Sequence, residues 1–268
     1  MRNSNKFVLI AGLPRTGSTL LLNVLAQNKK FHIESNSGLC QLMWDMQTSC
    51  KINCSEQLLA NNKLDSVSQN IIGSLPSLYY QDVSNKTIFD KCRPWASSSN
   101  IEMAKNYISK DIKAIVLVRP IDEIIKSIAK LHFDSGGNES IYEELMNEKS
   151  SWVMNSFFAT LLAAQSKADN LLFLSYNNIV NDLKNVIDKI YDFTNENKIN
   201  HNTTNIKTII KEDESVYDYP EIHNVRSKVS KTPNNIVLPE WVKDQADSMT
   251  NILFEHLEIK LHPEVRAA

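Results

Sequence analysis

The stretch that most constrains the fold runs from residue 7 to residue 27 and reads FVLIAGLPRTGSTLLLNVLAQ. Its first five residues form a continuous apolar run, which is typical of a buried parallel strand. A turn bounded by Gly12 and Gly17 follows, and then leucines recur at helical spacing, with Ser18 or Thr19 available to cap the helix. The order strand, glycine-bounded loop, helix predicts an anion-binding site, because backbone N–H groups and the helix dipole both favour negative charge there.

The loop nearly matches the phosphate-binding pattern G-x-x-x-x-G-K-[ST] of P-loop nucleotide-binding enzymes, and the difference is informative. Gly12 and Gly17 have the right spacing and Thr19 occupies the hydroxyl position, but the lysine position holds Ser18. The cation of the loop is Arg15. A nucleoside triphosphatase needs that lysine on the β- and γ-phosphates, together with Mg²⁺. We therefore expect the loop to hold a phosphate-like group without serving that chemistry.

The segment LPRTGSTLL resembles the 5′-phosphosulfate-binding loop of sulfotransferases that use 3′-phosphoadenosine 5′-phosphosulfate (PAPS). That family carries Lys or Arg at the position of Arg15, and the arginine form is closest to the tyrosylprotein and related bacterial and phage-type enzymes. The resemblance implies that PAPS is the co-substrate and that no metal ion is needed. It also implies that the phosphosulfate is bound by Arg15, Thr16, Gly17, Ser18 and Thr19.

A second buried strand carries the next part of the resemblance. Residues 113–119 read KAIVLVR and predict a parallel strand, and Pro120 opens the helix that follows. Arg119 and Ser127 are eight residues apart, so arginine offers a charged fork at the strand end and serine lies two turns into the helix. In the family, an Arg and a Ser at this spacing bind the 3′-phosphate of PAPS, which the resemblance implies for Arg119 and Ser127.

A third strand, expected over residues 87–89, ends in Asp90 and Lys91. Ligands bind at the carboxyl ends of strands in open α/β sheets, and the resemblance implies that Lys91 reaches the transferring sulfuryl group. The cytosolic members of the family place a catalytic His two residues after this Lys, where this chain has Arg93. Asp90 could instead be the magnesium-binding acid of a nucleoside triphosphatase, or could pair with Arg93.

Because this chain has Arg93 where the cytosolic members have the catalytic His, we expect a carboxylate to act as the general base. Residues 31–34 predict a brief strand or an extended segment, and the Arg-loop enzymes use a Glu about one short strand downstream of the loop as the base. The resemblance points to Glu34, although a strict count gives Asn36. A carboxylate in a partly closed site can accept the proton of an attacking hydroxyl. The alternative is a glutamate on a solvent-exposed loop.

Two further segments resemble cofactor contacts of the family. Residues 171–175 predict a strand, and the sequence that follows is similar to the family's Tyr-Glu-Asp-Leu segment, which implies that Tyr176 lies near the nucleotide. A tyrosine that only packs at the strand end is the alternative. The sequence HNVRSKV resembles a basic stretch with which related enzymes clamp the 3′-phosphate, which implies that role for Arg226, Ser227 and Lys228. A solvated basic loop is the alternative.

The remaining pattern is mainly helical. We expect the helices of residues 37–80 to cover the acceptor cleft, with breaks near Gly73 and Pro76 and another possible at Asn61–Asn62. The other expected helices span 97–109, 143–169 and 239–257. Together these elements predict a single sulfotransferase-like α/β domain over residues 1–268, with a P-loop-like, mostly parallel sheet of about four or five strands flanked by helices.

Composition excludes several classes of protein. The net charge of −2 argues against a nucleic-acid-binding protein, so any basic site must be local. The four cysteines and six histidines show no metal-ligand spacing, and we expect no catalytic metal and reduced thiols at Cys50 and Cys54. No apolar run has the length of a signal peptide or a membrane span, so we expect a cytoplasmic protein without a membrane partner.

The predicted reaction is transfer of a sulfuryl group from PAPS to a hydroxyl or amine, which leaves adenosine 3′,5′-bisphosphate. The acceptor class stays open among small molecules, carbohydrates and proteins, because acceptor specificity lies in the variable helical segments. Two other functions are kept. A P-loop small-molecule kinase predicts Mg²⁺-dependent ATP binding, and a non-catalytic nucleotide-binding module predicts bisphosphate binding without turnover.

Overall fold

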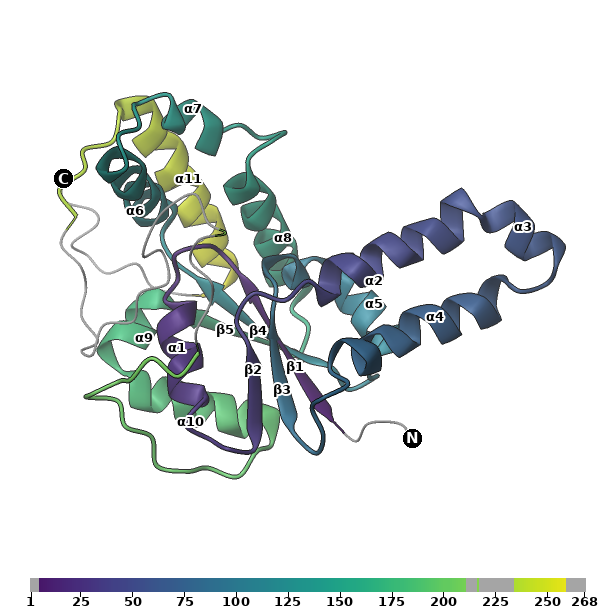
Figure 1. Ribbon diagram of the computed structural model, residues 1–268. Helices are drawn as coiled ribbons and strands as arrows, with labels where there is room; N and C mark the ends of the chain where they lie inside the picture. Colours follow the sequence, from purple (N-terminus) through teal and green to yellow (C-terminus); the bar gives the residue numbers. More distant parts are fainter. Residues whose placement is uncertain (1–4, 211–215, 217–233, 259–268) are drawn as a thin grey trace.

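The computed structural model describes residues 5–210, 216 and 234–258, and its centre is a five-stranded sheet (Figure 1). Every pair of neighbouring strands is parallel, and the spatial order is β2-β3-β1-β4-β5. The strands are β1 (Lys6–Gly12), β2 (Phe31–Glu34), β3 (Thr87–Lys91), β4 (Lys113–Val118) and β5 (Leu171–Ser175). The expected α/β fold with a parallel sheet flanked by helices is confirmed, and the segment of residues 31–34 is a strand.

The central strand is β1, which pairs with β3 on one side and with β4 on the other. Its apolar run is buried on both faces, as Val8 and Leu9 are fully inaccessible to solvent. In the register of the sheet, Ile10 lies opposite Lys91 and Gly12 lies opposite Leu117. Because all five strands are parallel, their carboxyl ends meet at one edge of the sheet, and this edge carries the candidate site.

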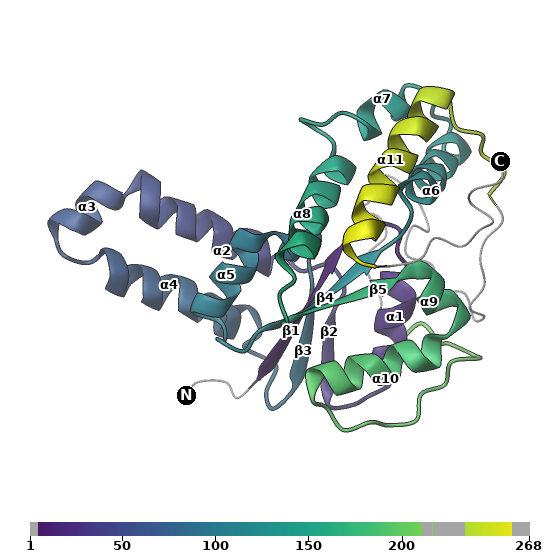
Figure 2. The same ribbon diagram turned by 180° about the vertical axis from the view of Figure 1, so that it is seen from behind.

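Helices cover both faces of the sheet (Figures 1 and 2). On one face, residues of α1 (Ser18–Leu25), α9 (Tyr176–Asn181) and α10 (Leu183–Thr194) pack against Val8, Ile10 and Ile115. On the other face, α2 (Leu39–Thr48), the 3₁₀ turn η2 (Arg93–Ala96) and α5 (Ser98–Tyr107) pack against Leu9 and Val116. A third cluster joins α6 (Ile121–Asp134), α7 (Ile141–Leu145), α8 (Trp152–Ser166) and α11 (Glu240–His256).

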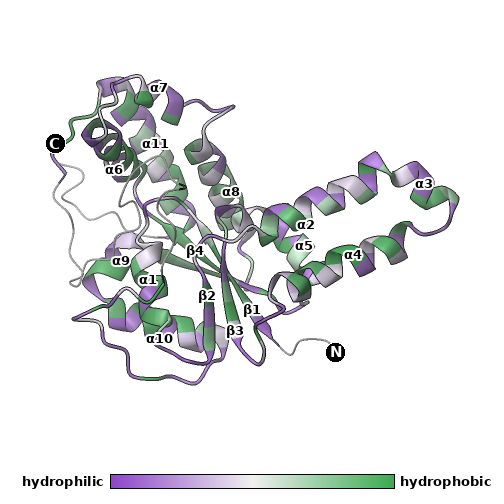
Figure 3. Cartoon of the chain, in the orientation of Figure 1, coloured by the Kyte–Doolittle hydropathy of each residue, from purple (hydrophilic) through white to green (hydrophobic). Residues whose placement is uncertain are grey.

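Apolar residues are concentrated on the strands of the sheet, while apolar and polar residues alternate along the helices (Figure 3). Several apolar side chains of the helices face the core, although others, such as Ile52 and Leu59, are exposed. Hydrophobic burial of this kind supplies the main driving force for folding. Within the described ranges of the chain, no helix combines the length and apolarity required to cross a bilayer.

A helical arm projects from the body of the protein (Figures 1 and 2). It consists of α2, the π-helical turn η1 (Ser49–Asn53), α3 (Ser55–Ala60) and α4 (Leu64–Tyr79). The possible break at Asn61–Asn62 is confirmed, and Asn62 there adopts a left-handed φ of 54°. The expected breaks at Gly73 and Pro76 are wrong, because α4 runs through both. Pro76 lies in the last turn of α4 and is buried, so packing there outweighs the lost backbone hydrogen bond.

The single helix expected over residues 143–169 is two helices, α7 and α8. Between them, the side-chain oxygen of Asn147 accepts hydrogen bonds from the backbone N–H groups of Lys149 and Ser150. The hydroxyl of Ser151 then caps α8, accepting from the N–H groups of its second and third residues. These side chains give the backbone an alternative to helical hydrogen bonds, which ends α7 early. The side chain of Trp152, the first residue of α8, is 37% exposed.

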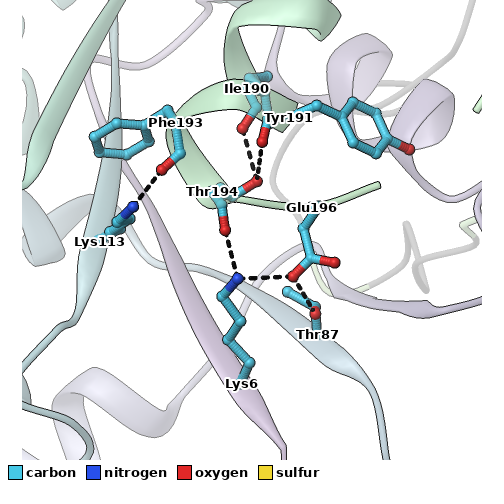
Figure 4. A network of polar contacts seen from close by, with 8 residues as sticks. All are labelled: Lys6, Thr87, Lys113, Ile190, Tyr191, Phe193, Thr194 and Glu196. Atoms are coloured by element: carbon cyan, nitrogen blue, oxygen red, sulfur yellow. Dashed lines mark hydrogen bonds and ion pairs between the residues drawn. The ribbon is translucent and has the colours of Figure 1, made fainter. Parts of the chain in front are cut away.

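The edge of the sheet opposite the candidate site is fastened to the end of α10 (Figure 4). The ammonium of Lys6 on β1 donates to the backbone carbonyl of Thr194 and forms an ion pair with Glu196 at 2.9 Å. The ammonium of Lys113 on β4 donates to the carbonyl of Phe193. The last carbonyls of a helix lack partners within the helix and carry the negative end of its dipole, so two lysine ammonium groups stabilise this terminus.

His201 links α1 to α10. Its ring atoms Nδ1 and Nε2 lie 2.8 Å from the carbonyl oxygen of Val24 and 2.8 Å from the hydroxyl of Tyr191. A carbonyl can only accept, so Nδ1 carries the proton, and in the neutral ring Nε2 accepts from the hydroxyl. Burial lowers the pKa of His201, which agrees with a neutral ring at pH 7.

Candidate active site

The carboxyl edge of the sheet collects the predicted site residues of the described ranges (Figure 1). The glycine-bounded loop follows β1, Glu34 ends β2, and Lys91 ends β3. Arg119 follows β4 and Tyr176 follows β5, so each of the five strands delivers at least one candidate. The predicted Arg226, Ser227 and Lys228 lie outside the described residues.

The loop begins with a glycine that no other residue could replace without strain. Gly12 has a φ of +110°, and a Cβ atom added there would lie 2.2 Å from the carbonyl oxygen of Leu117. The N–H of Leu13 donates to that same oxygen at 2.8 Å. The first turn of the loop is therefore held against β4 by a close backbone approach that only glycine permits.

The rest of the loop leads directly into the N-terminus of α1. Arg15 adopts a left-handed φ of 56°, and the hydroxyl of the buried Thr16 donates to the carbonyl of Leu13 at 3.0 Å. The N-cap residue is Gly17, with a φ of 77°, so the expectation that Ser18 or Thr19 caps the helix is wrong. Among the described residues, no side chain caps α1. The N–H groups of its first turn therefore suit an external anion.

Four of the predicted cofactor residues, from separate parts of the chain, lie in mutual contact. The Nε of Arg15 donates to the hydroxyl of Ser127 on α6 at 3.2 Å. The Nη1 of Arg119 donates to the backbone carbonyl of Arg15 at 2.7 Å. The guanidinium of Arg119 also stacks on Tyr176, 4.0 Å from the ring centroid, and forms an ion pair with Glu123 at 3.0 Å. We call Arg15, Arg119, Ser127 and Tyr176 the arginine cluster.

The arginine cluster carries an excess of positive charge. Burial lowers the pKa of Arg15, and the charge of Arg119 lowers it further. An arginine keeps its proton even so, because its unperturbed pKa lies above 12. Two partly desolvated guanidinium groups beside the amino end of a helix repel each other, so an anion bound between them would relieve the repulsion.

Glu34 and Lys91 end neighbouring strands but face opposite sides of the sheet. Side chains alternate along a strand, so Lys91 shares a face with Phe89, which packs in the cluster that contains α1. Glu34 shares a face with His32, whose ring centroid lies 5.5 Å from that of Tyr80 at the end of the arm. Lys91 is therefore on the side of the glycine-bounded loop, and Glu34 is on the side of the arm.

Asp90 is fully buried and is hydrogen-bonded by three side chains. Its carboxyl oxygens accept from the hydroxyl of Ser37 at 2.7 Å, the hydroxyl of Tyr80 at 2.6 Å and the indole N–H of Trp95 at 2.6 Å. Burial raises the pKa of Asp90, and the three donors oppose that effect. The side chain thus fixes the end of β3 to the arm and to η2, a structural role rather than the magnesium-binding one considered above.

Arg93, considered as a partner of Asp90, lies with its guanidinium 4.6 Å from the ring centroid of Trp152.

Three residues that contact the candidate site were not predicted from the sequence: Ser37, Trp95 and Glu123. The spacing of four residues between Arg119 and Glu123 on a helical segment was a signal for their ion pair. A buried tryptophan needs an acceptor for its N–H, which was a signal for Trp95.

The described residues contain no group of three or more His, Cys, Asp or Glu side chains arranged to hold a metal ion. Arginine side chains and backbone N–H groups, both present at this edge of the sheet, suit phosphate oxygens.

A family model described as "Sulfotransferase domain" matches residues 5–232. No curated protein matches the sequence. Among solved structures, a sulfotransferase domain from the curacin biosynthetic pathway aligns over 97% of this chain and 100% of its own, with 16% identity and a TM-score of 0.53.

A sulfotransferase from Alicyclobacillus acidocaldarius aligns over 95% of this chain and 96% of its own, with 12% identity and a TM-score of 0.53. Retinol dehydratase, solved with androsterone and the inactive cofactor PAP, aligns over 97% and 83%, with 17% identity and a TM-score of 0.51. At these identities the similarity establishes a shared fold.

Proposed function

This chain belongs to the sulfotransferase family, and we propose that it transfers a sulfuryl group from PAPS to a hydroxyl or amine of an acceptor, with release of adenosine 3′,5′-bisphosphate. The observation that carries the proposal is the arginine cluster. It joins the loop after β1, the end of β4, α6 and the start of α9 around two guanidinium groups. A nucleotide with phosphate groups at both its 3′ and 5′ positions matches this charge distribution.

The cluster and the loop supply two kinds of anion contact. We assign the 5′-phosphosulfate to Arg15, to the residues Thr16–Thr19 and to the uncapped first turn of α1, and the 3′-phosphate to Arg119 and Ser127. We assign Tyr176, which stacks on Arg119, to a contact with the nucleotide. The complex of a structural neighbour with PAP is consistent with this assignment.

The reaction forms a bond from the acceptor oxygen or nitrogen to sulfur and breaks the bond from sulfur to the bridging phosphate oxygen. Negative charge then grows on the bridging oxygen and the sulfuryl oxygens. Arg15, the N–H groups of the loop and Lys91 would stabilise this charge, because donors fixed before the reaction need no reorganisation. Glu34 would accept the proton of the acceptor. The enzyme's remaining task is to align the two reactants.

The opposite faces of Glu34 and Lys91 suggest how the acceptor approaches. A base on the arm side and a cation on the loop side would leave the acceptor group at the edge between them. The acceptor would therefore enter from the side of α2 and α4, which agrees with the expectation that residues 37–80 cover the acceptor cleft. A small molecule, a carbohydrate or a protein side chain could each present a hydroxyl or amine there.

The first test is calorimetric titration of the whole chain with adenosine 3′,5′-bisphosphate in EDTA, beside a titration with ATP and Mg²⁺. Micromolar or tighter binding of the bisphosphate, about −8 kcal/mol, is expected without a metal. Binding of Mg-ATP alone would indicate a kinase and would refute the assignment of Arg119 and Ser127.

Turnover is tested separately by incubating the protein with PAPS and panels of hydroxyl and amine acceptors, and by following bisphosphate release. Tight bisphosphate binding with no sulfated product from any panel would favour a non-catalytic nucleotide-binding module.

A further inference from the structure

The two ends of the arm meet at one carboxyl oxygen. Ser37 lies just before α2, where the arm begins, and Tyr80 directly follows α4, where the arm ends. In both views these two helices leave the sheet side by side (Figures 1 and 2). The two hydroxyls donate to Oδ2 of Asp90, at 2.7 Å from Ser37 and 2.6 Å from Tyr80. We call Ser37, Tyr80 and Asp90 the base of the arm.

The base of the arm is also bonded to Lys91, the last residue of β3. The backbone N–H of Ser37 donates to the carbonyl of Lys91 at 2.9 Å. Ser37 therefore holds Asp90 through its side chain and Lys91 through its backbone. The hydroxyl of Ser37 in turn accepts from the N–H of Leu39, the first residue of α2, at 3.0 Å. The start of the arm is thus joined to the last two residues of the strand.

The chain that follows Lys91 is fixed from the other side. The indole N–H of Trp95 donates to Oδ1 of Asp90 at 2.6 Å, so η2 is tied back to the same carboxyl. The N–H of Cys92 donates to the carbonyl of Ile10 on β1 at 3.0 Å. Asp90 and Trp95 are both fully buried. The backbone of Lys91 is therefore held between the base of the arm and the central strand.

Asp90 cannot itself reach an anion in the glycine-bounded loop. Side chains alternate along a strand, so Asp90 faces the arm while Lys91, on the opposite face, lies on the side of the loop. Asp90 is fully buried, whereas Lys91 is partly exposed. An anion in the loop would contact Lys91 and not Asp90, so any effect of Asp90 on that anion must pass through the placement of Lys91.

We propose that Asp90 is a positioning residue for sulfuryl transfer and that it acts through Lys91. Its carboxyl holds the base of the arm against the end of β3, and this junction fixes the backbone from which the Lys91 side chain extends. The inference rests on the proposed function, in which Lys91 stabilises the bridging oxygen of PAPS. Precise placement matters there, because a displacement of about 1 Å can lower a rate about 100-fold.

Adenosine 3′,5′-bisphosphate reports on Lys91 without an acceptor. The oxygen that bridges phosphorus and sulfur in PAPS stays on the 5′-phosphate when the sulfuryl group leaves, so Lys91 would contact it in the bisphosphate complex as well. Lys91→Ala is expected to weaken bisphosphate binding about tenfold or more, the scale of a lost charge-assisted contact.

Asp90→Asn keeps the size of the side chain but replaces one accepting oxygen with an amide group that donates. It is expected to weaken bisphosphate binding about fivefold or more. Asparagine carries no negative charge, so electrostatics alone would leave anion binding unchanged or strengthen it. Weaker binding in Asp90→Asn would therefore indicate displacement rather than a change of charge.

The decisive test is a double-mutant cycle read by calorimetry with the bisphosphate. In the Lys91→Ala background, Asp90→Asn should weaken binding by less than about twofold, because the lysine through which it acts is gone. In the Arg119→Ala background it should cost the full fivefold or so, because Arg119 follows a different strand, β4. Equal losses in the two backgrounds, or an unchanged affinity in Asp90→Asn alone, would refute the proposal.

Milder variants test the same junction with the carboxyl in place. Tyr80→Phe removes one of the three donors and is expected to weaken bisphosphate binding about threefold, again only when Lys91 is present. Tyr79→Phe is the matched control, because the hydroxyl of Tyr79 accepts from the N–H of Gly38 at 3.1 Å instead. It should leave the affinity unchanged, and equal losses in the two variants would contradict the role of Asp90. Urea denaturation of each variant establishes that the titrated protein is folded.

Turnover with PAPS and an acceptor that the panels identify supplies a second readout. Asp90→Asn should lower kcat about tenfold or more, and a normal kcat beside weakened bisphosphate binding would refute the effect on sulfuryl transfer. The binding data separate this inference from the proposed function. Absence of bisphosphate binding by the wild type would refute the proposed function and the inference together, whereas tight binding with equal losses in both backgrounds would refute the inference alone.

Discussion

Replacing Arg119 with alanine removes three contacts at once. The largest is the hydrogen bond to the carbonyl of Arg15, which is worth about 2 kcal/mol because its donor is charged. Stacking on Tyr176 contributes about 1 kcal/mol, and the partly exposed ion pair with Glu123 contributes about 0.5 kcal/mol. Arg15 regains some stability when its like-charged neighbour disappears. We therefore expect the free energy of unfolding to fall by about 2–3 kcal/mol, measured by urea denaturation.

The same substitution is expected to weaken binding of adenosine 3′,5′-bisphosphate by about 2 kcal/mol or more, which is about 30-fold in affinity at 25 °C. Calorimetry at a ligand concentration well above the weakened Kd measures this loss on protein that is still folded. Arg119→Lys should fall between wild type and alanine, because lysine keeps the charge but lacks the planar fork and the stacking surface.

Glu123→Gln is the matched control, because it removes the ion pair and leaves the guanidinium of Arg119 in place. It should change the free energy of unfolding by less than about 0.5 kcal/mol and the affinity by less than about threefold. Unchanged affinity in Arg119→Ala would refute the assignment of the 3′-phosphate. Unchanged stability would refute the energies given to the three contacts.

The other predictions concern the base, the loop and a buried histidine. Glu34→Gln should keep bisphosphate affinity and lower turnover with PAPS by about 100-fold or more, so normal turnover would remove Glu34 as the base. Gly12→Ala should lower the free energy of unfolding by about 3 kcal/mol or more, because the added Cβ would meet the carbonyl of Leu117. Gly136 also has a positive φ, but open space surrounds it. Gly136→Ala should therefore lower the free energy of unfolding by only about 1 kcal/mol in the same urea experiment. Because the pKa of His201 is lowered in the folded state, the folded protein binds fewer protons than the unfolded protein near this pKa. The neutral ring of His201 therefore contributes its full stabilisation above the unfolded pKa of about 6.5, and this stabilisation is lost as the pH falls below that value. His201→Gln should therefore flatten the decrease in stability between pH 7.5 and pH 5.5, and an unchanged slope would contradict this reasoning.

The parts of the fold that the sequence predicts best are those governed by local rules. The apolar runs of β1 and β4 are largely buried on the sheet, that of β5 is partly buried, and Pro120 and Pro239 stand at the N-caps of α6 and α11. These signals depend on hydrophobic periodicity and on the fixed φ of proline, and both act within a few residues.

Features decided by tertiary contacts were not predictable in the same way. Proline predicts a break at Pro76, but the residue is buried in the last turn of a continuous helix. A capping hydroxyl was expected at Ser18 or Thr19, but Gly17 is the N-cap because the chain turns there through a left-handed conformation.

The candidate site likewise combines features that local sequence rules predict with features that only tertiary contacts produce. The spacing of Arg119 and Ser127 gives two turns of helix, but only the packing of α6 beside the loop brings Ser127 to Arg15. Likewise, the partners of Asp90 come from the arm and from η2, at sequence distances where spacing carries no information.

The projecting arm divides the molecule into regions that should open at very different rates. Its far end includes α3, which has no buried residue, and both Ile52 and Leu59 there are more than half exposed. Unfolding this end breaks few side-chain contacts, so its amide hydrogens should exchange with solvent long before those of β1. The end of the arm is therefore the place to insert a peptide tag or attach a fluorophore, since such a graft would leave the sheet and its carboxyl edge folded.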